Sequence, residues 1–293
     1  MIGFAALHPL VAAIYFVSVL LFSMFGAHPA LHLLALLGGA AFCLKLEWGT
    51  RAVSGMLYYL PLVFAVALTN PLFSHNGTTV LFFLSGNPVT LEAVLYGVDL
   101  GLALLGVLLW FRCINRIFTS DKLEFLLGRL SPKLALLIST ALRFIPLLKM
   151  RGEALRQTQT ALGLFATDTW SDKLKMSARM YSALITRALE DAIDTGASMK
   201  ARGYGLKGRS HFALYRFGRA DAGVLCLVLA LDVGLLAVTA MGGLQFSFYP
   251  SISTAPMRTY TCFALALYAL LCLLPFILQV KEGLQWKYSI SKI

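Results

Sequence analysis

The sequence predicts an all-α integral membrane protein with about six transmembrane helices and a cytoplasmic helical hairpin between the fourth and fifth of them. Hydrophobic residues make up 58% of the 293-residue chain and charged residues only 13%, whereas charged residues make up about a quarter of an ordinary soluble domain. The mean hydropathy is +0.76. Most of the 25 Lys and Arg residues fall between Arg112 and Arg219, which predicts one long cytoplasmic segment.

Six apolar stretches are long enough to cross the hydrocarbon core as helices, which takes about 20 residues. They cover residues 8–25, 28–46, 54–73, 92–112, 220–241 and 258–280. Lys45 and Arg51 place the connection between the second and third spans inside, whereas residues 70–91 and 242–257 contain no Lys or Arg and are expected outside. Both termini are therefore expected in the cytoplasm. The chain would divide into spans one to four (1–112), a cytoplasmic segment (113–219), and spans five and six with a tail (220–293).

The cytoplasmic segment is predicted to form two long helices. Residues 131–150 are apolar enough to be a rival span, but an Arg such as Arg143 in hydrocarbon costs about 2.5–3.5 kcal/mol. A cytoplasmic or interfacial helix, bent at Pro146, is expected instead. From Asp172 to Lys200, apolar residues recur at helical spacing opposite a charged face. The face expected to hold the hairpin together comprises Ala178, Tyr181, Leu184, Ile185, Ala188, Leu189 and Ala192.

The stretch from Gly203 to Ser210 raises the question of a nucleotide site, because it reads G-x-x-x-x-G-R-S. A phosphate-binding loop joins a β-strand to a helix, and it has Lys at the position that Arg209 occupies here. An amphipathic helix pattern, and no strand pattern, precedes these glycines, so nucleotide binding is not expected. Gly203 or Gly205 instead suits a left-handed helix cap, which leaves Arg202 at the helix end.

From the residues alone, Arg202 has two interpretations. The simpler one is that it follows the bias of basic residues toward the cytoplasm and complements the negative C-terminal end of the helix dipole. The alternative is a docking residue, because the planar guanidinium pairs bidentately with a carboxylate and stays charged at physiological pH.

The stretch from Leu184 to Gly205 resembles a cytoplasmic signature of the T components of energy-coupling factor (ECF) transporters, the EcfT and CbiQ family. Residues 143–163 are similar to the preceding cytoplasmic signature of this family. Residues 86–97, before the fourth span, also resemble the family's sequences. Most of an A-M-x-A-R-G-Y type ending is reproduced by Ala197, Met199, Ala201, Arg202, Gly203 and Tyr204. The fold implied is an all-helical membrane domain with long cytoplasmic coupling helices.

The resemblance implies the transmembrane coupling subunit of an ABC-type importer in a bacterial or archaeal plasma membrane. Such a subunit has no enzymatic site and binds no cofactor directly. It holds two ABC-type ATPases, which bind ATP and Mg, and couples them to a small membrane S component that captures a vitamin or a transition-metal ion. Because the S component selects the substrate, the substrate itself is not predicted.

Docking on the ATPases is implied for Ala201, Arg202 and Gly203. Where the family's preceding signature has another Ala-Arg-Gly, this chain has Ala161, Leu162 and Gly163. The missing Arg leaves two possibilities for this contact. Leu162 fills the ATPase groove by apolar contact, or Arg156 supplies charge from a different helical phase.

Asp99 and Asp232 point to a different functional class, a proton- or ion-coupled secondary transporter, because carboxylates inside spans are costly and often mark ion pathways. The competing explanation is that each acid lies near an interface or bonds to a neighbouring helix. The five Cys and five His show no paired metal-ligand spacing, so no metal site is expected. No nucleophile and base pattern indicates an enzyme, and the net charge of +11 is assigned to membrane topology rather than to nucleic-acid binding.

Overall fold

A computed structural model describes residues 3–47, 50–74, 76–84, 87–163, 169–206, 215–252 and 259–290. The chain divides into two compact units. The membrane unit comprises the chain up to Leu123 and from Tyr215 onward, and the hairpin unit comprises Glu124–Leu214. Each unit is described by itself.

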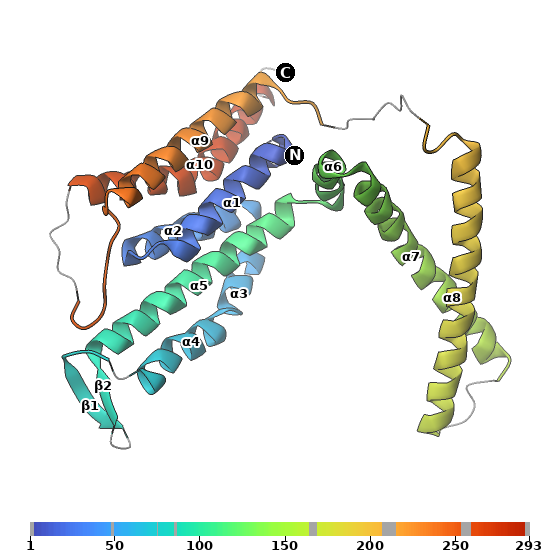
Figure 1. Cartoon of the computed structure of the whole chain (residues 1–293), viewed down its shortest axis with the longest axis horizontal. Coiled ribbons are helices and arrows are strands. Elements are labelled where there is room, and N and C mark those ends of the chain that lie inside the picture. Colours follow the sequence, from blue (N-terminus) through green and yellow to red (C-terminus); the bar gives the residue numbers. More distant parts are fainter. Residues whose placement is uncertain are drawn as a thin grey trace. The chain divides into compact units, whose positions relative to one another are not determined.

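The membrane unit is built almost entirely of helices (Figure 1). Its helices are the short 3-10 turn η1 (Phe4–Ala6), α1 (Pro9–Phe25), α2 (Pro29–Leu46), α3 (Thr50–Leu57), α4 (Leu60–Phe73), α5 (Leu91–Ile117), the start of α6 (Ser120–Leu130), α9 (Arg219–Ala240) and α10 (Thr259–Ile290). Among the described residues, five segments are long and apolar enough to cross a membrane, and α1 is a shorter apolar helix of 17 residues. The predicted fold class, an all-α integral membrane protein, is confirmed, whereas the count of six spans stays a prediction.

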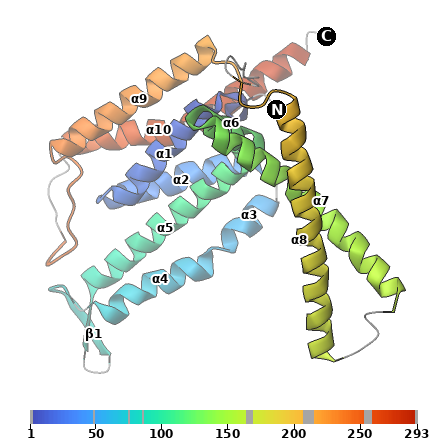
Figure 2. The ribbon, with the colours of Figure 1, turned by 45° about the vertical axis from the view of Figure 1, so that its right-hand side comes forward.

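Helix α5 is central in the membrane unit, with α4 on one side and α2 and α1 on the other (Figures 1 and 2). Helix α10 packs on α2, and α9 packs on α10 and α1. The core between α1, α2 and α5 is aromatic, and its rings meet mainly edge to face, as the ring quadrupole favours. They belong to Phe4, Tyr15, Phe16, Phe42 and Trp110. The indole nitrogen of the fully buried Trp110 donates to the carbonyl oxygen of Ala35 over 2.9 Å.

Two glycines one turn apart allow α4 to approach α5 closely. A Cβ atom on Gly97 would overlap the carbonyl oxygen of Ala67, and one on Gly101 would lie 3.2 Å from the carbonyl oxygen of Val63. Small residues at this spacing are a common means of bringing membrane helices together, because little hydrophobic driving force acts between helices in lipid.

The third predicted span is interrupted, because α3 ends at Leu57 and a turn at Tyr58 and Tyr59 precedes α4. Pro61 follows in the first turn of α4, where its missing N–H costs nothing. Helix α5 also continues to Ile117, past the predicted end at residue 112. These local changes leave the order of the spans unaltered.

The connection before α5 forms an antiparallel hairpin of β1 (Val80–Leu84) and β2 (Asn87–Thr90). The carboxylate of Glu92, in the first turn of α5, accepts from the hydroxyl groups of Thr79 at 2.6 Å and Thr78 at 3.1 Å. The sequence left the conformation of this connection open.

The starts of α1, α6 and α9 meet at one end of the membrane unit. The backbone N–H of His8 donates to Asp221 Oδ1 over 2.9 Å, and the buried Lys122 ammonium donates to the carbonyl oxygen of Ala5 over 2.6 Å. Burial lowers the pKa of Lys122 from its ordinary value. This common end agrees with the predicted alternation of the spans, and its assignment to the cytoplasm stays a prediction.

The hairpin unit consists of the end of α6 and two long helices, α7 (Pro132–Ala161) and α8 (Trp170–Ala201). Helix α7 contains Pro146 in its interior. The two helices cross, as both views show (Figures 1 and 2).

Candidate functional site

The crossing of α7 and α8 is marked by one ion pair and one close approach. Arg151 on α7 pairs with Asp191 on α8. Both side chains are mostly buried, with 32% of the Arg151 side chain and 26% of the Asp191 side chain exposed. A Cβ atom on Gly152 would lie 3.5 Å from Leu184 Cδ1. Since the helices cross here and run in opposite directions, their C-terminal ends lie at opposite ends of the hairpin unit (Figure 2).

Helix α8 ends in a left-handed glycine cap. Arg202 occupies the cap position with φ −81° and ψ 8°, and its N–H donates to the carbonyl oxygen of Ser198 over 3.1 Å. Gly203 follows at φ +82°, and the N–H of Tyr204 closes the turn on the carbonyl oxygen of Met199 over 3.0 Å. The left-handed conformation predicted here is confirmed at Gly203, and Gly205 at φ +99° shares it. Residues 207–210 of the stretch that resembles a nucleotide loop lie outside the described residues.

Helix α7 ends in the same backbone conformation. Leu162 occupies its cap position with φ −79° and ψ 2°, and its N–H donates to the carbonyl oxygen of Thr158 over 3.1 Å. Gly163 follows at φ +73°. Leu162 therefore stands at the structural position that Arg202 occupies on α8, and the departure at the first signature is confined to the side chain.

The residues of both ends are accessible. Leu162 exposes 70% of its surface, and Ala161, Gly163, Ala201 and Arg202 are exposed too, while Gly203 is half-buried. Arg202 has no acidic partner among the residues that the structure describes. One end thus presents a free guanidinium and the other an apolar side chain.

The packing face predicted for α8 is divided by the structure. Leu184 and Ala188 are half-buried on the side that faces α7, as is Asp191. The other predicted members, Ala178, Tyr181, Ile185, Leu189 and Ala192, are exposed. Together with Trp170 and Leu174 they form an exposed band on α8, here called the apolar stripe. The physical reason is that one crossing helix covers only one side of a broad apolar face.

The two acids inside predicted spans each bond to a neighbouring helix. Asp99 on α5 lies 2.8 Å from His32 Nδ1 on α2, and both residues are buried. Asp232 Oδ2 on α9 lies 2.5 Å from Ser18 Oγ on α1. The bonds to neighbouring helices that the competing explanation expects are therefore present for both acids.

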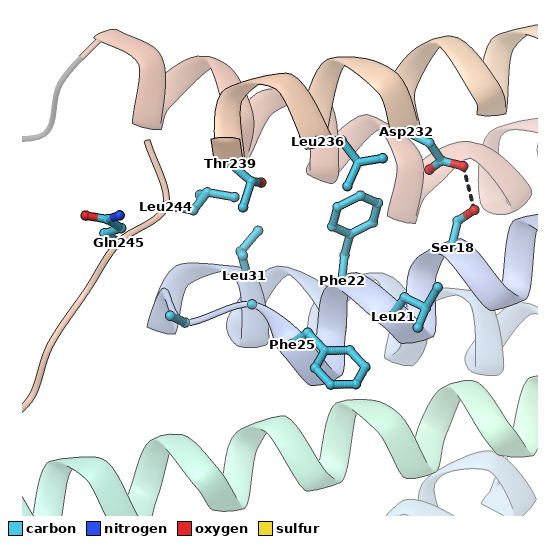
Figure 3. Close-up of a pocket in the computed structure, with 12 residues that line it drawn as sticks. Ser18, Leu21, Phe22, Phe25, Leu31, Asp232, Leu236, Thr239, Leu244 and Gln245 are labelled. Carbon is cyan, nitrogen blue, oxygen red and sulfur yellow. Dashed lines mark hydrogen bonds between the residues drawn. The ribbon is translucent and has the colours of Figure 1, made fainter. Parts of the chain in front are cut away.

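Asp232 also lines a cavity of about 510 Å³ between α1 and α9 (Figure 3). The cavity is walled mainly by apolar side chains such as Phe22 and Leu236, and the pair of Ser18 and Asp232 lies at one end of it. Asp232 Oδ1 is buried and has no hydrogen-bond partner within the described part of the chain. The hydrogen-bonding capacity of this carboxyl group is thus only partly used.

Comparisons with known proteins identify a family model and relatives that are similar to this chain. The model of the CbiQ family, described as "Cobalt transport protein", matches residues 6–212, a range that contains both helix ends. The chain is 41% identical over 108 residues to the energy-coupling factor transporter transmembrane protein EcfT of Listeria innocua, which covers 36% of this chain and 40% of that protein. The protein of the same name from Bacillus selenitireducens is 33% identical over 113 residues, 38% of this chain and 42% of the relative. The matches span about two fifths of the length of these curated relatives.

Proposed function

The chain belongs to the CbiQ family as a T component of an ECF transporter, and from this premise we propose that it couples the ATPases of an importer to its substrate-binding subunit. ATP and Mg bind in two partner ABC-type ATPases, and this chain supplies no catalytic group. A separate S component captures the substrate, a vitamin or a transition-metal ion. The relatives are named energy-coupling factor transporter transmembrane proteins, and the partners and substrate class are part of the proposal.

The observation that carries the proposal is the shared geometry of the two helix ends. Each long helix ends in an exposed cap residue followed by a left-handed glycine, at Leu162–Gly163 and Arg202–Gly203. The two ends are joined through a single crossing with its own ion pair. When the ATPase dimer closes on ATP, the ends move relative to each other, and the crossing turns this movement into a change of the angle between α7 and α8.

The two ends offer different chemistry to the ATPases. Arg202 pairs with acidic residues in one ATPase groove, because a free guanidinium forms charge-assisted bonds with carboxylates. Leu162 enters the other groove by apolar contact. This difference suits two non-identical ATPases, one with an acidic groove and one with an apolar groove.

The apolar stripe on α8 supplies the contact with the S component. Contiguous exposed apolar surface on a helix marks an interaction site, and Tyr181, Ile185 and Leu189 each expose more than half of their surface. Movement of α8 by the ATPases then reaches the S component directly, without a further linking element.

The test is purification of the tagged chain from native membranes in mild detergent, with measurement of bound proteins and ATP hydrolysis. The expected result is recovery of ABC-type ATPases and a small apolar membrane protein with the wild-type chain, and loss of the ATPases with Arg202→Glu. Lys200→Glu is the matched control, because Lys200 is exposed in the same last turn but lies outside the Ala-Arg-Gly sequence. Recovery of the chain alone from wild-type membranes, or equal loss with both variants, contradicts the proposal.

A second candidate function, proton- or ion-coupled transport by this chain alone, is favoured by one observation. Asp232 Oδ1 is buried next to a cavity without a hydrogen-bond partner among the described residues, and such an acid binds protons or cations in many transporters. Proteoliposomes that contain only this chain test it through proton flux, followed with a pH-sensitive dye. Flux that disappears with Asp232→Asn supports this candidate, and no flux above empty liposomes excludes it.

A further inference from the structure

A second cavity of the membrane unit lies near the ends of two predicted spans, 28–46 and 92–112, and beside the first part of a third, 54–73. Its volume is about 410 Å³. Glu47 directly follows α2, Tyr59 lies in the turn before α4, and Arg112 and Arg116 are in the last two turns of α5. Because Glu47 and Arg116 lie just beyond the predicted ends of two spans, the cavity is expected where the hydrocarbon core gives way to lipid headgroups.

The wall of this cavity has an apolar and a polar part. Leu108 and Phe111 form the apolar part, and Phe111 exposes 46% of its surface on α5. The polar part is formed by Asn115 and Arg116, about one turn past Phe111 on α5, and by Tyr59 in the turn before α4. An aromatic hydroxyl and a basic side chain at a span end are typical of groups that meet lipid headgroups.

The charges of the cavity leave one guanidinium without an acidic partner. Arg112 is held by Glu47 through two contacts, one of them from Nε to Oε1 at 3.3 Å. Arg116 is exposed, and within the described part of the chain no carboxylate pairs with it. Lys45, in the last turn of α2, adds a further exposed basic group nearby in the chain. The Arg112–Glu47 pair is neutral, so the cavity carries a net charge of about one positive unit.

We propose that this cavity binds the phosphate of an anionic phospholipid. Arg116 supplies the charge, and Tyr59 and Asn115 supply hydrogen-bond donors to the phosphate oxygens. The acyl chains lie along Phe111 and Leu108 toward the hydrocarbon core. A basic cavity between helices at a membrane surface selects anionic headgroups over zwitterionic ones, and the apolar wall favours a lipid over a soluble anion.

The test uses the full chain purified in maltoside detergent, titrated with phosphatidylglycerol or phosphatidylcholine and observed by native mass spectrometry. Phosphatidylglycerol is expected to bind in preference to phosphatidylcholine. A basic group at a membrane surface contributes about 1 kcal/mol, so Arg116→Gln is expected to weaken phosphatidylglycerol binding about fivefold. Arg116 is exposed, so the variant is expected to fold. Tyr59→Phe, which removes only the hydroxyl group, is expected to give a smaller loss.

Arg219→Gln is the matched control, because Arg219 is an exposed basic residue at the start of α9 and does not line the cavity. It is expected to leave phosphatidylglycerol binding unchanged. Equal binding of the two lipids, or equal loss with Arg116→Gln and Arg219→Gln, overturns the proposal. Glycerol phosphate, the headgroup without acyl chains, is a further arm. If it displaces phosphatidylglycerol at equal concentration, the cavity is a soluble-anion site and the lipid assignment is wrong.

Discussion

The ion pair between Arg151 and Asp191 is predicted to hold the two long helices at their crossing, and Asp191→Asn is the perturbation that tests it. Two unit charges about 4 Å apart near a protein surface attract by about 4 kcal/mol. Desolvation and ordering of the side chains offset most of this attraction. Because each side chain is less than one-third exposed, more remains than for a fully exposed pair, and we expect a coupling free energy of about 1 kcal/mol.

The assay is a double-mutant cycle with Arg151→Gln and Asp191→Asn in the full chain. Hydrogen exchange of the α7 and α8 amides, measured by mass spectrometry, reports the free energy of local opening. Either single variant removes the pair, so the double variant is expected to be no more open than each single variant.

Arg187 and Glu190 provide the internal comparison. Arg187 Nη1 lies 4.0 Å from Glu190 Oε2 on the surface of α8, and the two side chains are 68% and 62% exposed. A pair at this helical spacing contributes about 0.2–0.5 kcal/mol, so its cycle with Arg187→Gln and Glu190→Gln is expected to give a smaller coupling. If the effects of Arg151→Gln and Asp191→Asn simply add, the pair does not hold the crossing and the reasoning is refuted.

Three further predictions concern the α8 cap, the core and the buried lysine. Gly203→Ala places a side chain at φ +82°, which costs about 1 kcal/mol. It is expected to weaken ATPase co-purification, unlike Gly196→Ala in the open interior of α8. Trp110→Phe loses a buried hydrogen bond, which is expected to lower the free energy of unfolding by about 1–3 kcal/mol and the thermal midpoint by several degrees. Trp170→Phe, at an exposed site, is the control and is expected to leave the thermal midpoint unchanged. Because burial lowers the pKa of Lys122, the folded state loses this proton at a lower pH than the unfolded state, whose Lys has a pKa of about 10.4. The wild-type chain is therefore expected to gain stability relative to Lys122→Met as pH rises toward 10, and an unchanged difference in thermal midpoint between pH 7 and pH 10 contradicts this.

The features that the sequence predicted well are those with local physical causes. Long apolar runs require helices in a membrane, because every backbone polar group must be paired within the segment. The amphipathic pattern from Asp172 to Lys200 corresponds closely to α8, from Trp170 to Ala201. The cap at Gly203 was also predictable, since glycine adopts positive φ without strain.

The features that the sequence missed depend on which helices pack together. Asp232 and Ser18 are 214 positions apart, and Asp99 and His32 are 67 apart, so no local pattern joins them. The periodicity of α8 identified an apolar face but not its covered side, because that side is set by the crossing with α7. Similarly, the sequence has Leu162 in place of Arg, but only the structure shows that the backbone cap is retained. Gly163, which follows Leu162, was the sequence signal from which this left-handed cap could have been predicted.

The most direct test of the coupling role keeps Arg202 and places a photo-crosslinking residue, p-benzoylphenylalanine, at the neighbouring exposed position 200 or at position 162 of the chain in native membranes. The proposed docking predicts crosslinks to ABC-type ATPases from both positions, and to different ATPase chains if the two are non-identical. Position 187, exposed on α8 away from its end, serves as the control and is expected to give no ATPase crosslink. Absence of ATPase crosslinks from position 200, or an equal yield from position 187, would contradict the central claim.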